Sequence, residues 1–389
     1  MSLSSNAPML EGIKIIDLTT VVFGPYCTQI LADLGAEVIK IEQPTSGDVF
    51  RYSGKSAASK GMSPGHLSLN RNKKSVLLNL KETDDKAVIL KLIEGADIVI
   101  HNIRSKAIKR LGLDYDTLKQ TNAGLIYVHC VGFGSDGPYS NLQAYDDVIQ
   151  AASGATSLAG KVDGVSGPKY IPSLIADKTA GLHAVYATQA AIIHKLRTGE
   201  GQFVEVPMFE AFAHFILKEH LAGNTFEPPN APACYPRQID KNRQPFPTKD
   251  GHISIVPYTH ESVELLFELI GAPELKADMR FNSRRAISQN MTEVYAELRK
   301  HTPKKPTEAW LAIFSKASIP SMPIMPIDNI LEDPHLNATG FFIRSKHPTE
   351  GDIVEMREPS KFSAWQVPCP SPAPKLGENS VEIKRSIET

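Results

Sequence analysis

The sequence predicts an α/β fold, with a large domain built on a Rossmann-like parallel sheet and a smaller α+β domain. Over the first 210 residues, short apolar runs alternate with longer helical patterns, which is typical of βαβ units. Prolines then cluster between Ala222 and Arg243, where the chain changes character. With 389 residues, the chain also exceeds the size at which one hydrophobic core usually stops growing. We therefore expect two domains.

Six apolar runs are typical of strands that are buried on both faces of a sheet. In chain order they are Ile13–Leu18, Glu37–Glu42, Ser75–Leu80, Asp97–Ile103, Gly124–Phe133 and Phe203–Met208. Helical patterns are predicted between them at Pro25–Gly35, Asp84–Ala96 and Asp177–Leu196. This alternation predicts parallel strands joined by crossover helices.

The loops that follow these strands are the expected ligand site, because ligands of open parallel sheets bind beyond the carboxyl ends of the strands. These loops are Thr19–Gly24, Gln43–Asp48, Asn102–Arg104 and Gly132–Pro138.

A smaller unit is predicted after the proline-rich stretch. A hairpin turn at Lys249–Gly251 precedes three helical patterns, and a second pair of strands is expected around a turn at Glu350–Asp352. The helical patterns cover Glu261–Ile270, Thr292–Lys300 and Glu308–Ser318. The predicted division is therefore 1–221 for the large domain, 222–325 for the linker and small domain, and 326–389 for a segment that returns to the large domain.

The composition excludes several classes of partner. The formal net charge is −1 and no block of like charge occurs, so we expect neither nucleic acid nor a membrane surface as a partner. The four cysteines lie far apart without a CxxC pair, and the twelve histidines are scattered, so no metal site is predicted. The first residues lack the pattern of a signal peptide, and no apolar run is long enough to span a membrane. A cytoplasmic location is the simplest expectation.

Common catalytic motifs are absent. Gly54-Lys55-Ser56 resembles the end of a phosphate-binding P-loop, but Val49 stands where that motif requires a glycine. The first strand–helix turn contains Phe23-Gly24-Pro25 in place of the GxGxxG fingerprint of nicotinamide enzymes. Neither GxSxG nor HExxH occurs.

Asp177 directly precedes the longest helical pattern and permits two interpretations. An aspartate there ordinarily caps the helix, because its carboxylate accepts backbone N–H groups. The same position is expected to favour the ionised form, which can attack an activated carbonyl without a general base. The local pattern does not choose between a cap and a nucleophile.

The order of several segments resembles the class III coenzyme A transferases, the CaiB/BaiF family. The resemblance runs from Leu10 to the late KFSA and LGE segments. The segments that carry it are LEGIKIIDL, LADLGAEVIKIEQP, NRNKKS, ADIVIHNIRSKAIKRLGLDY, GFGSDGPYSNLQAYDDVIQAASG, IADKTAG and RTGEGQFVEVPM. The resemblance implies a nucleotide-binding-like large domain, a small domain and a homodimer whose two chains are interlinked, an exception to the usual unthreaded topology.

The resemblance also implies a site. Asp177 is the expected nucleophile, which would form an acyl-aspartyl anhydride and then an aspartyl-CoA thioester. Coenzyme A is then a thioester substrate, the second substrate is a carboxylic acid, and no separate cofactor is expected. The positions that correspond to coenzyme A contacts are Val22, Phe23, Leu78, Lys81, Asn102, Arg104, Arg110, Gln143 and Tyr145. Considered as residues alone, Lys81 and Arg110 fit a second interpretation as solvated charges at the edge of a helix. Tyr145 likewise fits a second interpretation as a core residue. The GFGSDGP turn is a candidate source of oxyanion donors.

Two departures bear on the substrate. Formyl-CoA transferases have a glutamine at the position of Val22, and a glycine-rich loop where this chain has the proline-rich CYPRQIDKNRQPFPTKDG. A succinyl-CoA-like donor and a small carboxylic acid are therefore favoured over formyl-CoA and oxalate, with Arg237 and Arg243 as candidates to meet a distal carboxylate.

Three alternatives remain at the level of the sequence. The first is an α-methylacyl-CoA racemase-like enzyme, although Tyr145 stands where that enzyme has the histidine of its histidine–aspartate pair. The second is a non-catalytic CoA-binding subunit, against which Asp177 argues. The third is a nucleotide-dependent enzyme on a similar sheet.

Overall fold

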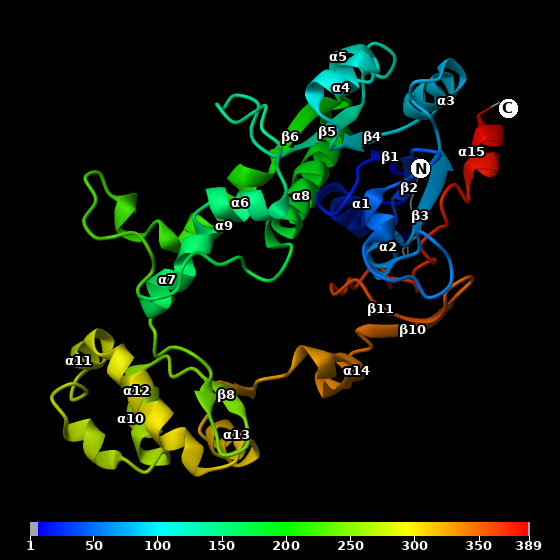
Figure 1. Ribbon diagram of the computed structural model, residues 1–389. Coiled ribbons are helices and arrows are strands. Elements are labelled where there is room, and N and C mark those ends of the chain that lie inside the picture. Colours follow the sequence, from blue (N-terminus) through cyan, green and yellow to red (C-terminus); the bar gives the residue numbers. More distant parts are fainter. Residues whose placement is uncertain (1–6, 388–389) are drawn as a thin grey trace. The chain divides into compact units, whose positions relative to one another are not determined.

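The computed structural model describes residues 7–387 (Figure 1). The chain divides into two compact units. Within the described residues, the first comprises the chain up to Thr156, Tyr170–Ile216, and the chain from His335 onward. The second comprises Ser157–Lys169 and Leu217–Pro334.

The first unit is built on a sheet of six parallel strands in the order β3-β2-β1-β4-β5-β6. The strands are β1 (Lys14–Leu18), β2 (Glu37–Glu42), β3 (Lys73–Leu77), β4 (Ile98–His101), β5 (Ile126–Val131) and β6 (Gln202–Pro207). All six overlap predicted runs, although β3 begins and ends earlier than the predicted Ser75–Leu80, and the α/β prediction with a Rossmann-like sheet is confirmed. The strand order reverses between β1 and β4, which is where such sheets bind ligands.

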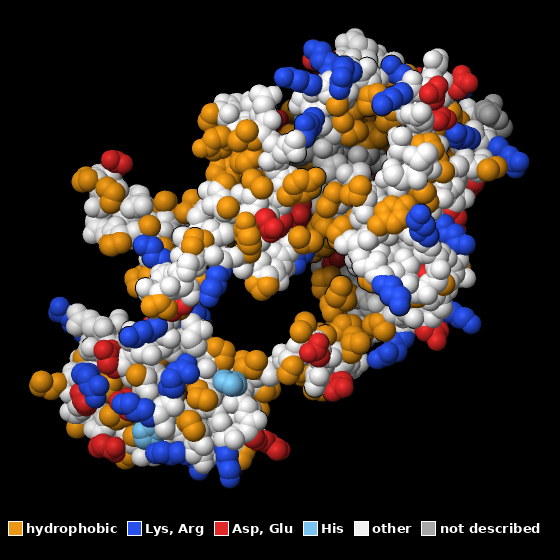
Figure 2. All heavy atoms as spheres, viewed as in Figure 1, with side chains coloured by type: hydrophobic (Ala, Val, Ile, Leu, Met, Phe, Trp, Pro, Cys, Tyr) orange, Lys and Arg blue, Asp and Glu red, His pale blue; other side chains and the backbone are white. Residues whose placement is uncertain are grey.

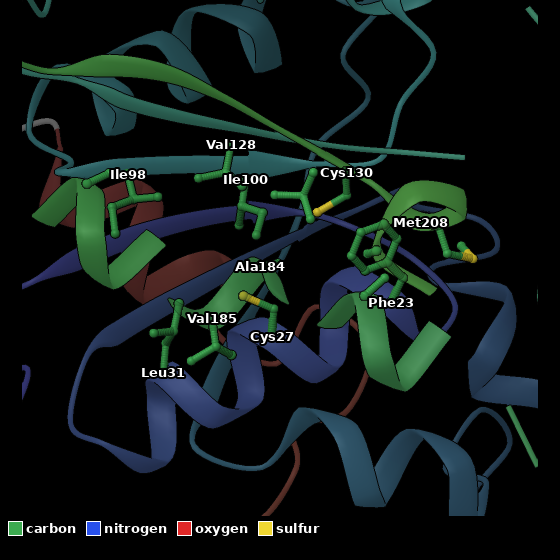
Figure 3. Close-up of a cluster of buried hydrophobic side chains, with 14 of the residues drawn as sticks. Phe23, Cys27, Leu31, Ile98, Ile100, Val128, Cys130, Ala184, Val185 and Met208 are labelled. Carbon is green, nitrogen blue, oxygen red and sulfur yellow. The ribbon is translucent and has the colours of Figure 1, made fainter. Parts of the chain in front are cut away.

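Helices cover both faces of this sheet. One core contains side chains of α1 (Phe23–Asp33), α8 (Ile175–Thr198) and α9 (Met208–His220). In Figure 3, side chains of β4 and β5 point toward those of α1 and α8. The opposite core contains α3 (Thr83–Glu94) and α4 (Ser105–Arg110). Neighbouring residues on a strand enter opposite cores because strand side chains alternate, as Ile15 and Ile16 do.

The end of the chain returns to the first unit. Strands β10 (Phe342–His347) and β11 (Gly351–Met356) pair antiparallel, and their turn lies at residues 348–350, earlier than the predicted Glu350–Asp352. Helix α15 (Ser380–Ser386) was not predicted. The segment before it covers the edge of β3, since Ser75 N donates to Asn379 Oδ1 at 3.0 Å. This contact satisfies an edge strand that would otherwise be open.

The second unit has its own core. Strands β7 (Phe246–Pro247), β8 (His252–Ile255) and β9 (Ser321–Pro323) form an antiparallel sheet. Its helices are α7 (Leu158–Asp163), α10 (His260–Leu269), α11 (Arg284–Gln289), α12 (Met291–His301) and α13 (Thr307–Lys316). Residues 157–169 belong to this unit although the sequence placed them in the large domain, because their glycine-containing pattern has no apolar run that marks a particular core.

Four short helices complete the chain: α2 (Pro64–Asn70), α5 (Tyr115–Leu118), α6 (Asp146–Ala152) and α14 (Pro334–Ala338). Between residues 7 and 387, none of the helices combines the length and the apolar character needed to cross a lipid bilayer.

Candidate active site

A cavity of about 510 Å³ opens at the carboxyl ends of β1 and β4, where the strand order reverses. The predicted loops Thr19–Gly24 and Asn102–Arg104 each contribute several lining residues, and the predicted loop Gly132–Pro138 contributes Gly132. The loop Gln43–Asp48 does not line the cavity, and residues 140–145 do. The predicted loops after β1 and β4 therefore border the cavity, whereas the loop after β2, one strand farther from the crevice, does not.

Six of the predicted site residues line this cavity: Phe23, Asn102, Arg104, Gln143, Tyr145 and Asp177. Four do not. Val22 lies beside it with 3% of its surface exposed, and Leu78 is 1% exposed within the core under β3. Lys81 and Arg110 are exposed on the surface. The structure thus brings together the nucleophile candidate and five of the nine proposed coenzyme A contacts.

Asp177 is the third residue of α8 and does not cap it. The residue before the helix is Leu174, which makes no side-chain cap. The capping carboxylate comes from Asp146 on α6, whose Oδ2 accepts the N–H groups of Ala176 at 2.8 Å and Asp177 at 3.0 Å. The capping interpretation of Asp177 is therefore wrong. Asp177 itself lines the cavity.

The electrostatic environment of Asp177 differs from the expectation that the helix N-terminus stabilises its ionised form. Burial of the side chain, followed by the nearby charge of Asp146, raises the pKa of Asp177 to about 7. The backbone N–H of Phe23, the first residue of α1, partly offsets this rise. Desolvation outweighs the helix dipole here because only 7% of the Asp177 surface is exposed. A carboxylate that is poorly stabilised in this way is a stronger nucleophile than a solvated one.

Asp146 is itself firmly held. It is 3% exposed, and its Oδ1 accepts Gln150 Nε2 at 2.6 Å. Both of its oxygens are therefore engaged, one by the start of α8 and one by its own helix. The capping role of Asp146 could not be predicted from the sequence, because a contact across 31 residues leaves no local signal.

Two histidines and an asparagine hold the loop after β4. Asn102 forms reciprocal bonds with the backbone of Thr20, as its Nδ2 donates to Thr20 O at 2.9 Å and its Oδ1 accepts Thr20 N at 3.1 Å. His101 Nδ1 accepts the N–H of Ile103 at 3.2 Å, and His129 Nε2 lies 3.0 Å from Ile103 O. The loops after β1 and β4 are thus joined across the crevice.

Positive charge lines the same end of the sheet. Arg104 and Lys106 border the cavity, and Lys109 with Arg110 lies farther along α4. Figure 2 shows Lys and Arg side chains gathered over the region of α4 and α5. Such side chains suit phosphate groups. Lys106 was missed from the sequence, where its distance of two residues from Arg104 was the available signal.

Two N–H groups of the GFGSDGP turn are engaged by side chains. Gly134 N donates to Glu210 Oε1 at 3.0 Å, and Ser135 N donates to Glu205 Oε1 at 2.9 Å. These two N–H groups therefore maintain the turn, and a role of the turn as a source of oxyanion donors stays a prediction.

Arg237 and Arg243 lie in the second unit. Arg237 Nε donates to the hydroxyl of Tyr295 at 3.2 Å and its guanidinium lies 4.8 Å from the ring centre of Tyr258. Arg243 Nη1 donates to Gln238 Oε1 at 2.8 Å. Across residues 7–387, no group of three or more His, Cys, Asp or Glu side chains is arranged to hold a metal ion.

Comparisons with known proteins agree with this architecture. Residues 10–380 match the family described as CoA-transferase family III. A succinate–glutarate CoA-transferase of Agrobacterium fabrum is 30% identical, with 98% of this chain and 96% of the relative covered. An acetyl-CoA:oxalate CoA-transferase of Acetobacter aceti is 32% identical, with 97% and 95% covered. The crystal structure of a CaiB/BaiF family protein from Brucella suis superposes with a TM-score of 0.84 at 29% identity, over 98% of this chain and all of that one.

Proposed function

The chain belongs to CoA-transferase family III, and we propose that it carries coenzyme A from a succinyl-CoA-like donor to a small carboxylic acid through covalent intermediates on Asp177. The observation that supports this most is the Asp177 carboxylate itself. It borders the cavity at the point where the strand order reverses, and its pKa is raised to about 7. The start of α8 is capped by Asp146 and not by Asp177.

The proposed reaction divides one acyl exchange into steps of similar energy. The Asp177 carboxylate attacks the donor thioester carbon, the C–S bond breaks, and coenzyme A leaves as a thiolate. The thiolate attacks the aspartyl carbonyl of the resulting anhydride, which releases the donor acid and forms an aspartyl-CoA thioester. The acceptor carboxylate then repeats both steps in reverse and regenerates Asp177. No proton is gained or lost in the cycle, so a general base is not required.

The coenzyme A contacts follow from the charges around the cavity. Arg104 and Lys106 provide cations for its phosphates, and Phe23 with Tyr145 provides apolar surface. Tyr145 is 65% exposed, so it is not the core residue that its sequence also permitted. Leu78, Lys81 and Arg110 stay in the proposal as positions that correspond to family contacts.

The proposed donor and acceptor rest on two features of the sequence, Val22 and the proline-rich stretch, and on the substrates for which the relatives are named. One of those relatives is named for succinate and glutarate and another for acetyl-CoA and oxalate, so both acid types belong in a substrate panel. We favour a succinyl-CoA-like donor because Val22 replaces the glutamine of formyl-CoA transferases.

A racemase-like function is disfavoured by Tyr145. A two-base racemisation needs a histidine at this position, and a tyrosine stands there instead, so one of the two bases is missing. We expect no deuterium at the α-carbon of a branched acyl-CoA incubated with the protein in D₂O, as measured by mass spectrometry.

We also propose a homodimer, as the resemblance implies. In the single chain, α8 and α9 expose large apolar side chains, among them Leu182, Tyr186 and Phe215. An exposed apolar surface of this kind is typical of association. Light scattering of the purified protein is expected to give twice the mass of the 42.6 kDa chain, and a monomer would contradict the proposal.

The decisive test is capture of the covalent intermediate. The protein would be incubated with succinyl-CoA, acetyl-CoA or formyl-CoA in turn, each with a panel of free acids, and digested. Mass spectrometry is expected to find an acyl or CoA adduct on the peptide that contains Asp177, and hydroxylamine should convert it to a hydroxamate. Transfer that proceeds without an adduct at Asp177 would show that another residue carries the reaction.

The pH dependence of the reaction follows from the same carboxylate. Because Asp177 must be ionised to attack, kcat/KM is expected to fall about tenfold per pH unit below pH 7. Replacing Asp146 with asparagine removes the neighbouring charge and should move this acid limb down by roughly one pH unit. The matched control is Asp147→Asn, an exposed aspartate on the same helix, which should leave the limb unchanged. An upward shift in the Asp146→Asn enzyme would contradict this electrostatic account.

A further inference from the structure

The loop between β1 and α1 borders the cavity and is held by side chains from neighbouring strands. Lys40 on β2 donates from Nζ to the carbonyl of Thr19 at 2.7 Å. Asn102 after β4 bonds both backbone groups of Thr20. The conformation of this loop is thus determined by residues distant in the chain.

Val21 is the strained residue of the loop. Its φ is +72°, in the left-handed region that a β-branched side chain rarely adopts because Cβ crowds the backbone. A conformation of this kind persists only where the surroundings hold it in place. The holding group is Asp48, whose Oδ1 accepts the N–H of Val21 at 3.0 Å.

Asp48 is a buried and well-anchored carboxylate. Only 1% of its surface is exposed, and its Oδ2 lies 3.0 Å from Nζ of Lys40, which is fully buried. Its own N–H donates to Glu42 Oε1 at 3.0 Å, and its Oδ1 also accepts Phe50 N at 3.0 Å. The Asp48 carboxylate therefore forms an ion pair with Lys40 through one oxygen and accepts the N–H of the strained Val21 through the other.

The direction of the first N–H groups of α1 depends on this loop. The helix begins at Phe23, two residues after Val21, and both residues line the same cavity as Asp177. The backbone N–H of Phe23 is close enough to the Asp177 carboxylate to lower its pKa. There is little room for the loop to shift, because a Cβ on Gly24 would lie 2.3 Å from Cγ2 of Thr19.

We propose that Asp48 is a positioning residue for Asp177: it holds Val21 in its left-handed conformation and so aims the Phe23 N–H at the nucleophile. The inference rests on the proposed role of Asp177. Before reaction this N–H stabilises the ionised carboxylate, and during attack on the aspartyl carbonyl it faces the oxygen on which negative charge develops. The other charged groups near the nucleophile are Asp146 on α6 and, along the cavity, Arg104 and Lys106.

The test compares Asp48→Ala with Asp97→Ala. Asp97 is a matched control because its carboxylate makes the same two kinds of contact. Its Oδ2 accepts the backbone N–H of Lys14 at 3.0 Å, and its Oδ1 accepts Nζ of Lys195 at 2.7 Å. It lies at the amino end of β4, away from the cavity. We expect Asp48→Ala to lower kcat about tenfold and to move the acid limb of kcat/KM to higher pH, because the carboxylate loses a donor. Asp97→Ala should change neither quantity.

Two further variants test the same proposal in case Asp48→Ala does not fold. Asp48→Asn keeps an oxygen acceptor for Val21 and should restore the acid limb toward that of the wild type. Val21→Pro leaves the buried ion pair intact but cannot adopt a positive φ or donate an N–H, so it should move the limb in the same direction as Asp48→Ala.

The outcomes separate this inference from the proposed function. If the wild type forms the Asp177 adduct but the acid limb stays in place in Val21→Pro and in any folded Asp48→Ala, the positioning role is overturned. If the wild type forms no adduct at Asp177, the proposed function fails instead, whatever the Asp48 variants do.

Discussion

Replacing Asp177 with asparagine is expected to abolish CoA transfer while making the folded chain more stable. The amide cannot form the anhydride or the aspartyl-CoA thioester, so transfer should fall by at least about 10³-fold. The variant should still bind the donor, because the cations around the cavity remain. Initial-rate measurements with succinyl-CoA and a small acid, together with equilibrium binding of the donor, test both statements.

The gain in stability follows from the raised pKa of Asp177. Above neutral pH the folded chain must hold a buried carboxylate whose pKa is about 7, whereas in the unfolded chain it ionises near its usual value of about 4. Ionisation therefore disfavours folding at high pH, and asparagine removes that cost. We expect the free energy of unfolding to rise by roughly 1–3 kcal/mol at pH 8 and the difference to vanish as the pH falls toward 4.

Thermal unfolding at several pH values measures this difference, with Asp147→Asn as the exposed control on α6. A lower unfolding temperature for Asp177→Asn at pH 8 would show that Asp177 has a structural role that outweighs its desolvation. Residual transfer above about a tenth of the wild-type rate would contradict its role as the nucleophile.

Replacing Arg51 with alanine is expected to cause the largest loss of stability. Arg51 is 1% exposed and makes two bonds to Glu42, from Nε to Oε1 at 2.7 Å and from Nη2 to Oε2 at 2.6 Å. It also donates to the carbonyl of Pro374 at 3.3 Å, which ties the end of the chain to β2. Removing one partner leaves the other charge buried and unpaired, which typically costs about 3–5 kcal/mol.

The loss of stability in Arg51→Ala is expected to depend on pH, because it arises from the ionised carboxylate of Glu42. The Arg51 and Lys40 charges and hydrogen bonds from Arg51 and Ser75 outweigh desolvation and hold the pKa of Glu42 at about 2. The stabilisation it provides is therefore present above pH 4.5 and is lost as the pH falls toward 2. The difference between wild type and Arg51→Ala should shrink over the same window in denaturant unfolding. Lys119→Ala, which removes an exposed ion pair with Asp116, should leave stability unchanged at every pH. Equal losses in both variants would contradict the argument.

Much of the fold could be predicted because its signals are local. The six strands are buried on both faces, so each appears as an apolar run within a few residues of its observed limits. Helix α15 was missed because it is short and polar, with Ile383 alone as its buried residue. Its place is set by contacts with β3, such as Leu77 N to Ser380 Oγ at 3.0 Å, which join residues 303 apart.

The site could be predicted in part. The loops after β1 and β4 follow from the rule for parallel sheets, and Asp177 was identified from the ordered segments around it. The roles of Asp146 and Asp48 could not be predicted, because each acts on a backbone group that is 27–31 residues away in the chain.

By itself, the sequence determined that the chain contains a parallel α/β sheet, and it predicted a ligand site at the carboxyl edge of that sheet with Asp177 as the candidate nucleophile. Only the tertiary structure decided that Asp146, and not Asp177, caps α8, that Asp177 borders the cavity, and that its pKa is raised to about 7. The physical reason is range. Apolar periodicity reflects interactions between neighbours along the chain, whereas desolvation and charge–charge repulsion depend on distances in space that only the folded chain creates.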